Sequence, residues 1–438
     1  MLLRRSFLQA GAAAALTPWP LMQALAQTSG PGYRALVCVF LFGGNDGNNT
    51  LVPVDARWSD YQRARPNLAI AREALLPLNL VNTGAERYGL HPAMAGVQQL
   101  VNAGQASVVA NIGALLVPTT KADIQNRRVP LPGNLYSHSD QQNANQSALA
   151  EAVSRHGWGG RLLERSVAPG STNRGYSAIS LAGGNIWQAG DQTLSPYRVS
   201  PGGQFGFDFY SPGSSDPLSQ AVGTLLGEVR TDPFEQTWLN MVGRSIENQR
   251  VLAAAVTSST LTTAFPGTGL GQQLQMAARL IQAQAQLGLS RQCFFCSIGG
   301  FDTHGDDQLQ RQNELLGELS DAIAAFHAAL VEMNRVQEVG LFTASDFNRN
   351  LPSNGAGTDH AWGNHHLVMG GGLPGGRLLG RFPQLLINGP DDLGQGTWVP
   401  STANEQLGVE LARWFGADAP TLAASFPHAA AFPRLQGL

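Results

Sequence analysis

The sequence has few of the residues that build covalent frameworks. Its 438 residues include three cysteines, Cys38, Cys293 and Cys296. So few cysteines in so long a chain exclude a disulfide-stabilised scaffold. Cys293 and Cys296 have the spacing of a redox motif, but they fall inside an apolar stretch that predicts a strand, where residues three apart point to opposite faces. We expect buried core cysteines; the alternative is a disulfide with Cys38 or a redox role.

Charge and long apolar runs are also scarce. Only 13% of the residues are charged, the net charge is -3, and Lys121 is the only lysine, so arginine carries nearly all the positive charge. There is no basic run, and this excludes the electrostatic footprint of a nucleic-acid-binding protein. No stretch approaches the roughly 20 apolar residues of a membrane-spanning helix. We therefore expect no nucleic-acid partner and no membrane span in the mature chain.

The first residues have the pattern of an export signal. Arg4 and Arg5 form a twin-arginine pair, residues 11–16 are weakly apolar, and residues 24–26 form a small-x-small cleavage site. We predict a twin-arginine signal peptide at residues 1–26, with the twin-arginine translocase as a partner during export and a periplasmic or secreted location. An ordinary secretory signal or an uncleaved anchor is the alternative. Proteins that use the twin-arginine route fold before they cross the membrane, often around a metal or cofactor.

Apolar runs alternate with amphipathic helical patterns along the rest of the chain, residues 27–438. The run at residues 35–42 lacks polar alternation, which is typical of a strand covered on both faces. We predict strands at 35–42, 107–112, 176–181, 292–298, 339–344 and 366–369. We predict helices at 56–63, 92–103, 216–227, 233–257, 269–288, 308–333 and 405–415, and one that begins near 137.

This alternation indicates an α/β fold in one domain, with a doubly wound, mostly parallel sheet flanked by helices. Apart from the helix at 56–63, residues 54–90 look irregular. Residues 150–260 are rich in loop-forming residues and then in helical patterns, so we interpret them as an inserted loop and helical region.

Acidic and imidazole side chains follow three of the predicted strands. Asp46 comes after the first strand, Asp302 and His304 after the strand at 292–298, and a longer loop follows the strand at 339–344. The candidate ligands are Asp46, Asp302, His304, Asp346, Asp359 and His360. Open α/β sheets place their chemistry just beyond the carboxyl ends of the strands. Such ligands suit a divalent ion such as Zn, Mn, Ca or Mg. The sequence does not determine how many ions the site would hold. The alternative is that these are turn residues capped by their own side chains.

Two other residues, Ser137 and Arg349, have two interpretations each. Ser137 could be a nucleophile, but a serine at the start of a helix is more often its cap. Ser139 and Gln142 have the spacing of a capping box. Arg349 could hold a small anionic substrate in bidentate fashion, or it could neutralise Asp346. His91 and His327 are expected to be structural or on the surface.

Five ordered motifs resemble one known family. They are Phe-Gly-Gly-Asn-Asp-Gly at 42–47, Tyr-Ser-His-Ser-Asp-Gln-Gln at 136–142, Gly-Gly-Phe-Asp-Thr-His at 299–304, Ser-Asp-Phe-Asn-Arg at 345–349 and Gly-Thr-Asp-His-Ala-Trp-Gly at 357–363. Together they resemble the bacterial domain of unknown function 1501 (DUF1501) family, over about residues 34–415. That family resembles, more distantly, the alkaline phosphatase and sulfatase superfamily.

The superfamily resemblance implies roles for these residues. It implies an exported, metal-dependent hydrolase-like protein acting on phosphate or sulfate esters, with Ser137 as the nucleophile. The implied metal ligands are Asp46, Asp302, His304, Asp346 and His360. Phe347 departs from the pattern, because it stands where the superfamily has a histidine ligand, and one metal or none is then expected. The alternative is a catalytically inactive scaffold or binding protein that keeps the fold.

Overall fold

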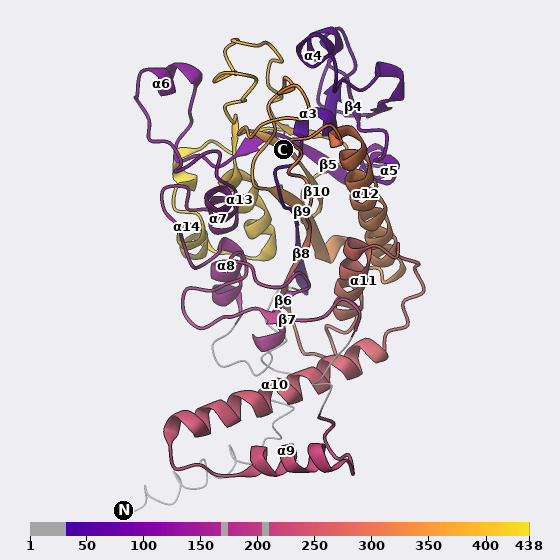
Figure 1. Cartoon of the computed structure of the whole chain (residues 1–438), viewed down its shortest axis with the longest axis vertical. Helices are drawn as coiled ribbons and strands as arrows, with labels where there is room; N and C mark the ends of the chain where they lie inside the picture. The colour runs from indigo at the N-terminus through magenta and orange to yellow at the C-terminus, as the bar shows by residue number, and fades with distance from the viewer. Residues whose placement is uncertain (1–31, 168–173, 204–209, 438) are drawn as a thin grey trace, which may run out of the picture. The chain divides into compact units, whose positions relative to one another are not determined.

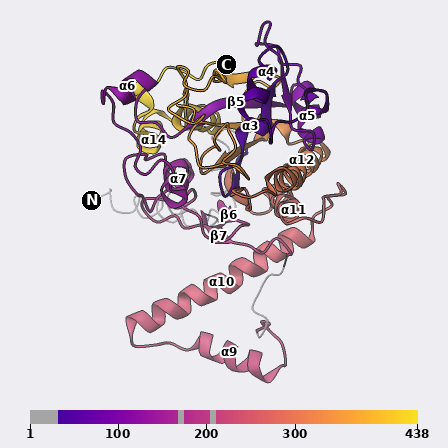
Figure 2. The same cartoon turned by 45° about the horizontal axis from the view of Figure 1, so that its top comes forward.

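The computed structural model describes residues 32–167, 174–203 and 210–437. Residues Arg34–Leu438 form one compact unit. Its centre is a sheet with helices packed on both faces, as Figures 1 and 2 show. The predicted signal peptide at 1–26 lies outside the described residues.

Nine strands form the central sheet in the described part of the chain. Their order is β11-β5-β10-β9-β1-β8-β6-β7, and β12 pairs with β5. The strands are β1 (Arg34–Leu41), β5 (Ala106–Gly113), β6 (Ala178–Ser180), β7 (Tyr197–Arg198), β8 (Arg291–Ile298), β9 (Val339–Ser345), β10 (Asn364–Gly370), β11 (Leu378–Gly380) and β12 (Thr402–Ala403). All six predicted strands are present, so the predicted α/β class is confirmed.

The sheet is parallel except for one strand. β1 pairs in parallel with both β8 and β9, whereas β10 pairs antiparallel with β9 and β5. The last residue of β1, Leu41, is in register with Ile298 and with Ser345, so three carboxyl ends share one edge. Asn364, the first residue of β10, pairs with Ile112 near the end of β5. The loop that enters β10 therefore reaches the same edge.

The strands at the centre of the sheet are almost wholly buried. Seven of the eight residues of β1 are buried, as an unbroken apolar run predicts. Cys38, Cys293 and Cys296 lie inside these strands as free, buried thiols, which confirms them as core residues. Burial raises the pKa of each thiol, so none is a reactive thiolate.

Helices cover the two faces of the sheet (Figure 1). One face carries α5 (Ala95–Asn102), α11 (Gly269–Gln282) and α12 (Gln308–Glu332). The other carries α7 (His138–Ser147), α8 (Trp158–Ser166), α13 (Asn404–Phe415) and α14 (Ala419–Ser425). In the predicted helix α12 the apolar side chains at helical spacing are buried: Leu315, Leu316, Leu319, Ile323 and Phe326.

Residues 54–90 are more ordered than their sequence indicates. β2 (Leu51–Pro53), β4 (Tyr88–Leu90) and β3 (Leu76–Pro77) form a small antiparallel sheet beside α4 (Trp58–Ala64). Strands of two or three residues are too short to show the alternation that identifies a strand. Two further short helices are α3 (Gly47–Thr50) and α6 (Lys121–Gln125).

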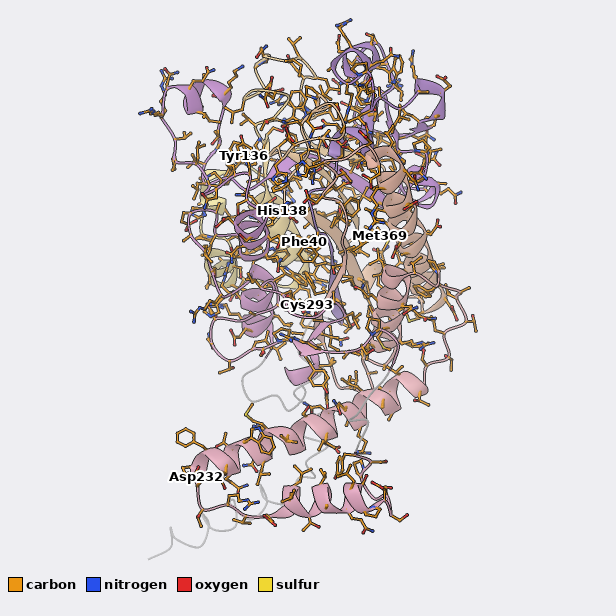
Figure 3. All side chains as sticks on the ribbon, viewed as in Figure 1. Phe40, Tyr136, His138, Asp232, Cys293 and Met369 are labelled. Atoms are coloured by element: carbon orange, nitrogen blue, oxygen red, sulfur yellow. The ribbon has the colours of Figure 1, made fainter. Side chains whose placement is uncertain are left out.

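The range predicted as an insertion contains parts of the main fold. Its first part supplies α8, β6 and β7, and two helices follow, α9 (Pro217–Gly227) and α10 (Pro233–Thr257). Asp232 caps the start of α10 (Figure 3). Large apolar side chains on this pair are exposed: Leu218, Leu225, Val229, Phe234, Trp238 and Met241. None of the helices among the described residues combines the length and apolarity needed to cross a membrane.

Candidate metal centre

Polar loops from separate strands and the start of one helix meet at the edge described above. Asp302 and His304 lie in the loop after β8, and His360 lies in the loop between β9 and β10. His138 is the first residue of α7 and is marked in Figure 3. The strand ends therefore bring together side chains that are up to 222 residues apart in sequence, from His138 to His360.

Three of these side chains form a group with metal-ligand geometry. His138 Nε2 and His360 Nε2 each lie 3.4 Å from Asp302 Oδ1. One ligand atom from each residue lies within 4.8 Å of the other two. His304 Nε2 is 3.0 Å from Asp302 Oδ1 and 3.0 Å from His360 Nε2. The predicted ligands Asp302, His304 and His360 are thus together, and His138 joins them.

Contacts behind the rings determine which imidazole nitrogen faces the group. His360 Nδ1 lies 2.7 Å from the carbonyl oxygen of Tyr136. Because a carbonyl only accepts, Nδ1 carries the hydrogen and Nε2 keeps its lone pair. His138 Nδ1 lies 2.6 Å from Asp346 Oδ2 and donates in the same way. In neutral rings the two Nε2 lone pairs therefore face the Asp302 carboxylate oxygen. The hydrogen bond to Asp346 and the charges of Asp346 and Asp302 raise the pKa of His138 above its ordinary value.

This arrangement fits a divalent cation. Acceptor atoms that face one another repel unless a positive charge lies between them. In a tetrahedral zinc site with bonds of about 2.0–2.1 Å, neighbouring ligand atoms are about 3.4 Å apart, and the separations around Asp302 Oδ1 are 3.0–3.4 Å. Asp302 and His304 are about half exposed, so the group is open to solvent.

The protonation of two of these side chains also suits metal binding. Burial acts to raise the pKa of Asp302, but the hydrogen bond and charge of Arg349 outweigh burial and lower it. Burial lowers the pKa of His360 below its ordinary value of 6.5. At neutral pH Asp302 is therefore ionised and His360 neutral, the forms in which both bind metal ions.

Arg349 is enclosed by the protein. Its guanidinium is fully buried and donates to the carbonyl oxygens of Gly43, Gly44, Phe301 and Thr358. It also contacts Asp302 Oδ1 and, at 3.2 Å, His304 Nε2. Each guanidinium nitrogen thus has a protein acceptor. Arg349 pairs with Asp302 and not with Asp346, and its donors face the protein instead of an open substrate position.

Two other predicted ligands lie one contact away from the group. Asp346 is buried and bonds to His138. Asp359 is exposed, with Oδ1 3.4 Å from His304 Nδ1. Phe347, which replaces an expected histidine, packs its ring against the rings of His360 and His138, at centroid distances of 4.4 and 4.8 Å. It supplies a wall of the site and no ligand.

The Asp46 carboxylate is directed at an arginine instead of the histidines. Its Oδ2 accepts from Arg65 Nη2 at 2.7 Å and from Gln308 Nε2 at 2.7 Å. Its Oδ1 accepts from Arg65 Nη1 at 3.2 Å and from the backbone N–H of Asn48 at 3.1 Å. Both side chains of the Asp46–Arg65 pair are almost fully buried. Both oxygens of the Asp46 carboxylate are therefore occupied by protein donors, and neither faces the histidine group.

Ser137 is the N-cap of α7. Its hydroxyl accepts from the backbone N–H of Asp140 and donates to Asp140 Oδ2 at 2.6 Å. The Ser139 hydroxyl lies 3.2 Å from it. The capping interpretation of Ser137 therefore has a geometric basis, with Asp140 as its partner.

Replacing Ser137 with alanine is expected to lower the free energy of unfolding by about 1 kcal/mol, and replacement with glycine by a few tenths, because glycine tolerates the cap conformation better. Urea denaturation followed by circular dichroism measures both changes. A larger loss in the glycine variant than in the alanine variant would contradict this assignment.

The sequence did not predict His138 as a member of the site or Arg65 as the partner of Asp46. His138 lies between Ser137 and Ser139, and the predictions for this segment concerned the two serines. Its signal was its position at a helix start within a polar motif. Arg65 lies in a segment that looked irregular, and only the folded chain brings it to Asp46.

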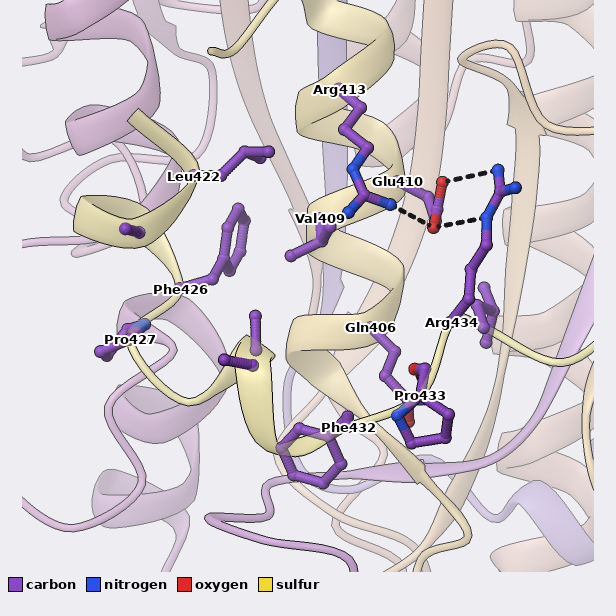
Figure 4. Close-up of a pocket in the computed structure, with 14 residues that line it drawn as sticks. Gln406, Val409, Glu410, Arg413, Leu422, Phe426, Pro427, Phe432, Pro433 and Arg434 are labelled. Atoms are coloured by element: carbon purple, nitrogen blue, oxygen red, sulfur yellow. Dashed lines mark hydrogen bonds and ion pairs between the residues drawn. The ribbon is translucent and has the colours of Figure 1, made fainter. Parts of the chain in front are cut away.

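A separate cavity of about 390 Å³ lies between α13, α14 and the segment after α14 (Figure 4). Apolar side chains, among them Leu422 and Phe426, line it. Glu410 accepts there from Arg413 at 2.9 Å and from Arg434 at 3.1 Å. It shares no residue with the histidine group.

Residues 236–417 match the model of the DUF1501 family, described as a protein of unknown function. The predicted family resemblance, which covered about residues 34–415, is confirmed for this segment. The matched segment includes Asp302, His304, Arg349 and His360, but not His138. None of the curated proteins matches the chain.

The chain is similar to several solved structures at low sequence identity. Ps i-CgsB in complex with k-i-k-neocarrahexaose has 9% identity and a TM-score of 0.35, with 89% of this chain and 73% of that chain covered. The PsFucS1 sulfatase from Pseudoalteromonas sp. has 11% identity and a TM-score of 0.33, with 90% and 70% covered. The lipoteichoic acid synthase LtaP from Listeria monocytogenes has 10% identity and a TM-score of 0.26, with 72% and 56% covered.

Proposed function

We propose that this chain is an exported, metal-dependent hydrolase-like protein that acts on small phosphate or sulfate esters. One observation carries the metal part of the proposal: the convergence of His138 Nε2, Asp302 Oδ1 and His360 Nε2 at the edge of the sheet. The ester class and the export route come from the sequence motifs, including Arg4 and Arg5.

The chain's own residues have distinct tasks in this proposal. His138, Asp302 and His360 hold the ion, and His304 lies beside them. A bound divalent ion supplies Lewis-acid polarisation of an ester oxygen. Arg349 holds Asp302 in its ionised form and fixes the loops around it. Phe347 excludes water from one side of the His138 and His360 rings.

A second candidate is a scaffold or binding protein that keeps the ion but has no turnover. A specific observation favours it: the two residues predicted for catalysis are already engaged. Ser137 caps α7, and each guanidinium nitrogen of Arg349 has a protein acceptor. In the hydrolase, water is therefore the better candidate nucleophile than Ser137.

Metal content and turnover distinguish these functions. The protein is purified from an export-competent host, and its Zn, Mn, Ca and Mg are counted by mass spectrometry. Aryl phosphate and aryl sulfate panels then measure turnover. Asp302→Ala removes a ligand, and Asp60→Ala, which changes an exposed carboxylate, is the matched control.

We expect about one equivalent of metal in the wild-type and Asp60→Ala proteins and less than about a tenth in Asp302→Ala, since the ligand count sets affinity. Metal with no turnover on either panel favours the binding protein. Wild-type protein with no metal, or equal metal in Asp302→Ala, contradicts the proposed centre.

A further inference from the structure

Three side chains of one helix face bond to a single residue, Asp346. His138 Nδ1 lies 2.6 Å and Gln142 Nε2 2.9 Å from its Oδ2. Asn145 Nδ2 donates to its backbone carbonyl at 3.0 Å. Asp346 itself is buried, at 1% exposure, directly after β9. Both donors to the carboxylate reach Oδ2, and the buried Oδ1 accepts no hydrogen bond.

The sequence spacing explains why these three residues can share one partner. His138, Gln142 and Asn145 are separated by four and then three residues in α7. Residues at these intervals lie on the same face of a helix. The first two turns of α7 are thus attached to the end of β9 at one point, and the orientation of the helix start is fixed there.

The contact sets both the tautomer and the direction of the His138 ring. In the neutral ring, a carboxylate that accepts from Nδ1 leaves Nε2 as the lone-pair nitrogen, and this nitrogen faces Asp302. The rings of Phe347 and His360 pack against the imidazole at 4.8 and 4.5 Å. Rotation of the ring would break the 2.6 Å contact and lose this packing.

We propose that Asp346 is a positioning residue that holds His138 as a ligand of the metal centre, acting through the imidazole and not on the ion. This inference rests on the proposed function. His360 is held differently, by the neutral carbonyl of Tyr136. The hydrogen-bond acceptors behind the two imidazole rings therefore differ. The acceptor for His138 is a side chain, which a mutation can remove, whereas the acceptor for His360 is a backbone carbonyl.

Metal affinity and the imidazole tautomer together test the role of Asp346. In the intact, metal-free protein, ¹⁵N NMR distinguishes His138 protonated at Nδ1 from His138 protonated at Nε2. Competition with a zinc-binding dye then measures the Kd for Zn²⁺ in wild-type protein and in Asp346→Asn. Gln142→Met is the matched control, because it removes a donor to the same Oδ2 and leaves the His138 contact. Thermal unfolding reports whether each variant folds.

We expect the Nδ1–H tautomer in the wild-type protein and a Zn²⁺ Kd about 10- to 100-fold weaker in Asp346→Asn, the usual effect of losing a residue that orients a ligand. Gln142→Met should change the Kd less than about threefold. An Nε2–H tautomer in the wild-type protein overturns the inference even where Asp346→Asn fails to fold. Equal Kd values in wild-type protein and Asp346→Asn also overturn it. If the wild-type protein does not bind Zn²⁺, the proposed function is overturned instead. The NMR measurement still reports whether Asp346 holds the His138 ring, because it is made without metal.

Discussion

Replacing Arg65 with methionine is expected to lower the free energy of unfolding by about 3–5 kcal/mol, the usual cost of leaving a buried charge without its partner. Asp46 and Arg65 are almost fully buried and are joined at 2.7 and 3.2 Å. Methionine fills a similar volume, so the loss reports the unpaired carboxylate. Urea denaturation monitored by circular dichroism gives the difference.

Two controls separate charge from shape. The double variant Asp46→Asn and Arg65→Met should recover much of the loss, because no ion is then left buried. Arg63→Met breaks an exposed pair with Asp60 and should cost less than about 1 kcal/mol. A loss below about 1 kcal/mol for Arg65→Met would show that the Asp46 charge finds another partner or water.

Acidification from pH 6 to pH 5 is expected to lower the free energy of unfolding by about 2–3 kcal/mol. Burial lowers the pKa of His91 to about 4 and that of His365 and His366 to about 3. These histidines stay neutral when folded, whereas each binds a proton below pH 6.5 when unfolded, so stability falls with pH in this window. At 1.36 kcal/mol per pH unit and proton, three histidines contribute about 3–4 kcal/mol.

One buried carboxyl acts in the opposite direction. Burial raises the pKa of Glu405 to about 7, against the contacts of His428. The folded state therefore binds a proton between about pH 4.5 and 7 that the unfolded state releases, and Glu405 regains about 1 kcal/mol over the same interval. The free energy of unfolding still falls by about 2–3 kcal/mol, because the contribution of the three histidines exceeds that of the single carboxyl.

The matched test of this pH dependence compares a buried and an exposed histidine. His366→Gln should reduce the slope of unfolding free energy against pH by about 1.4 kcal/mol per unit, the contribution of one proton. His156→Gln, at an exposed position, should leave the slope unchanged. Chemical denaturation at half-unit steps between pH 5 and 7 gives both slopes. Equal slopes in wild-type protein and His366→Gln would contradict the assignment of His366 as a buried neutral residue.

The central strands and long helices could be predicted because their burial leaves a pattern in the sequence. The unbroken apolar run of β1 and the inward stripe of α12 are examples. β7 and β11, with two and three residues, were not predicted and stand at the two ends of the sheet's strand order. Their short length gives no periodicity. Strand direction is likewise set by chain connections, so the antiparallel β10 could not be distinguished from its parallel neighbours.

The candidate site was predictable where its residues directly follow strands, as Asp302 and His304 do. The partners of each group were not predictable, because they depend on contacts across long sequence distances. Asp46 and Asp346 have the same sequence context, a carboxylate after a buried strand. The fold pairs the first with Arg65 and the second with His138. The residue type indicates a ligand in both cases, but the neighbouring donor determines the role.

The enclosed guanidinium of Arg349 has a consequence for how the centre would exchange its ion. It joins the carbonyls of Gly43, Phe301 and Thr358, which belong to three different loops. These loops therefore cannot open one at a time without losing a charged hydrogen bond. An ion would therefore reach the group from the solvent-facing side of Asp302, which is about half exposed, without any opening of these loops.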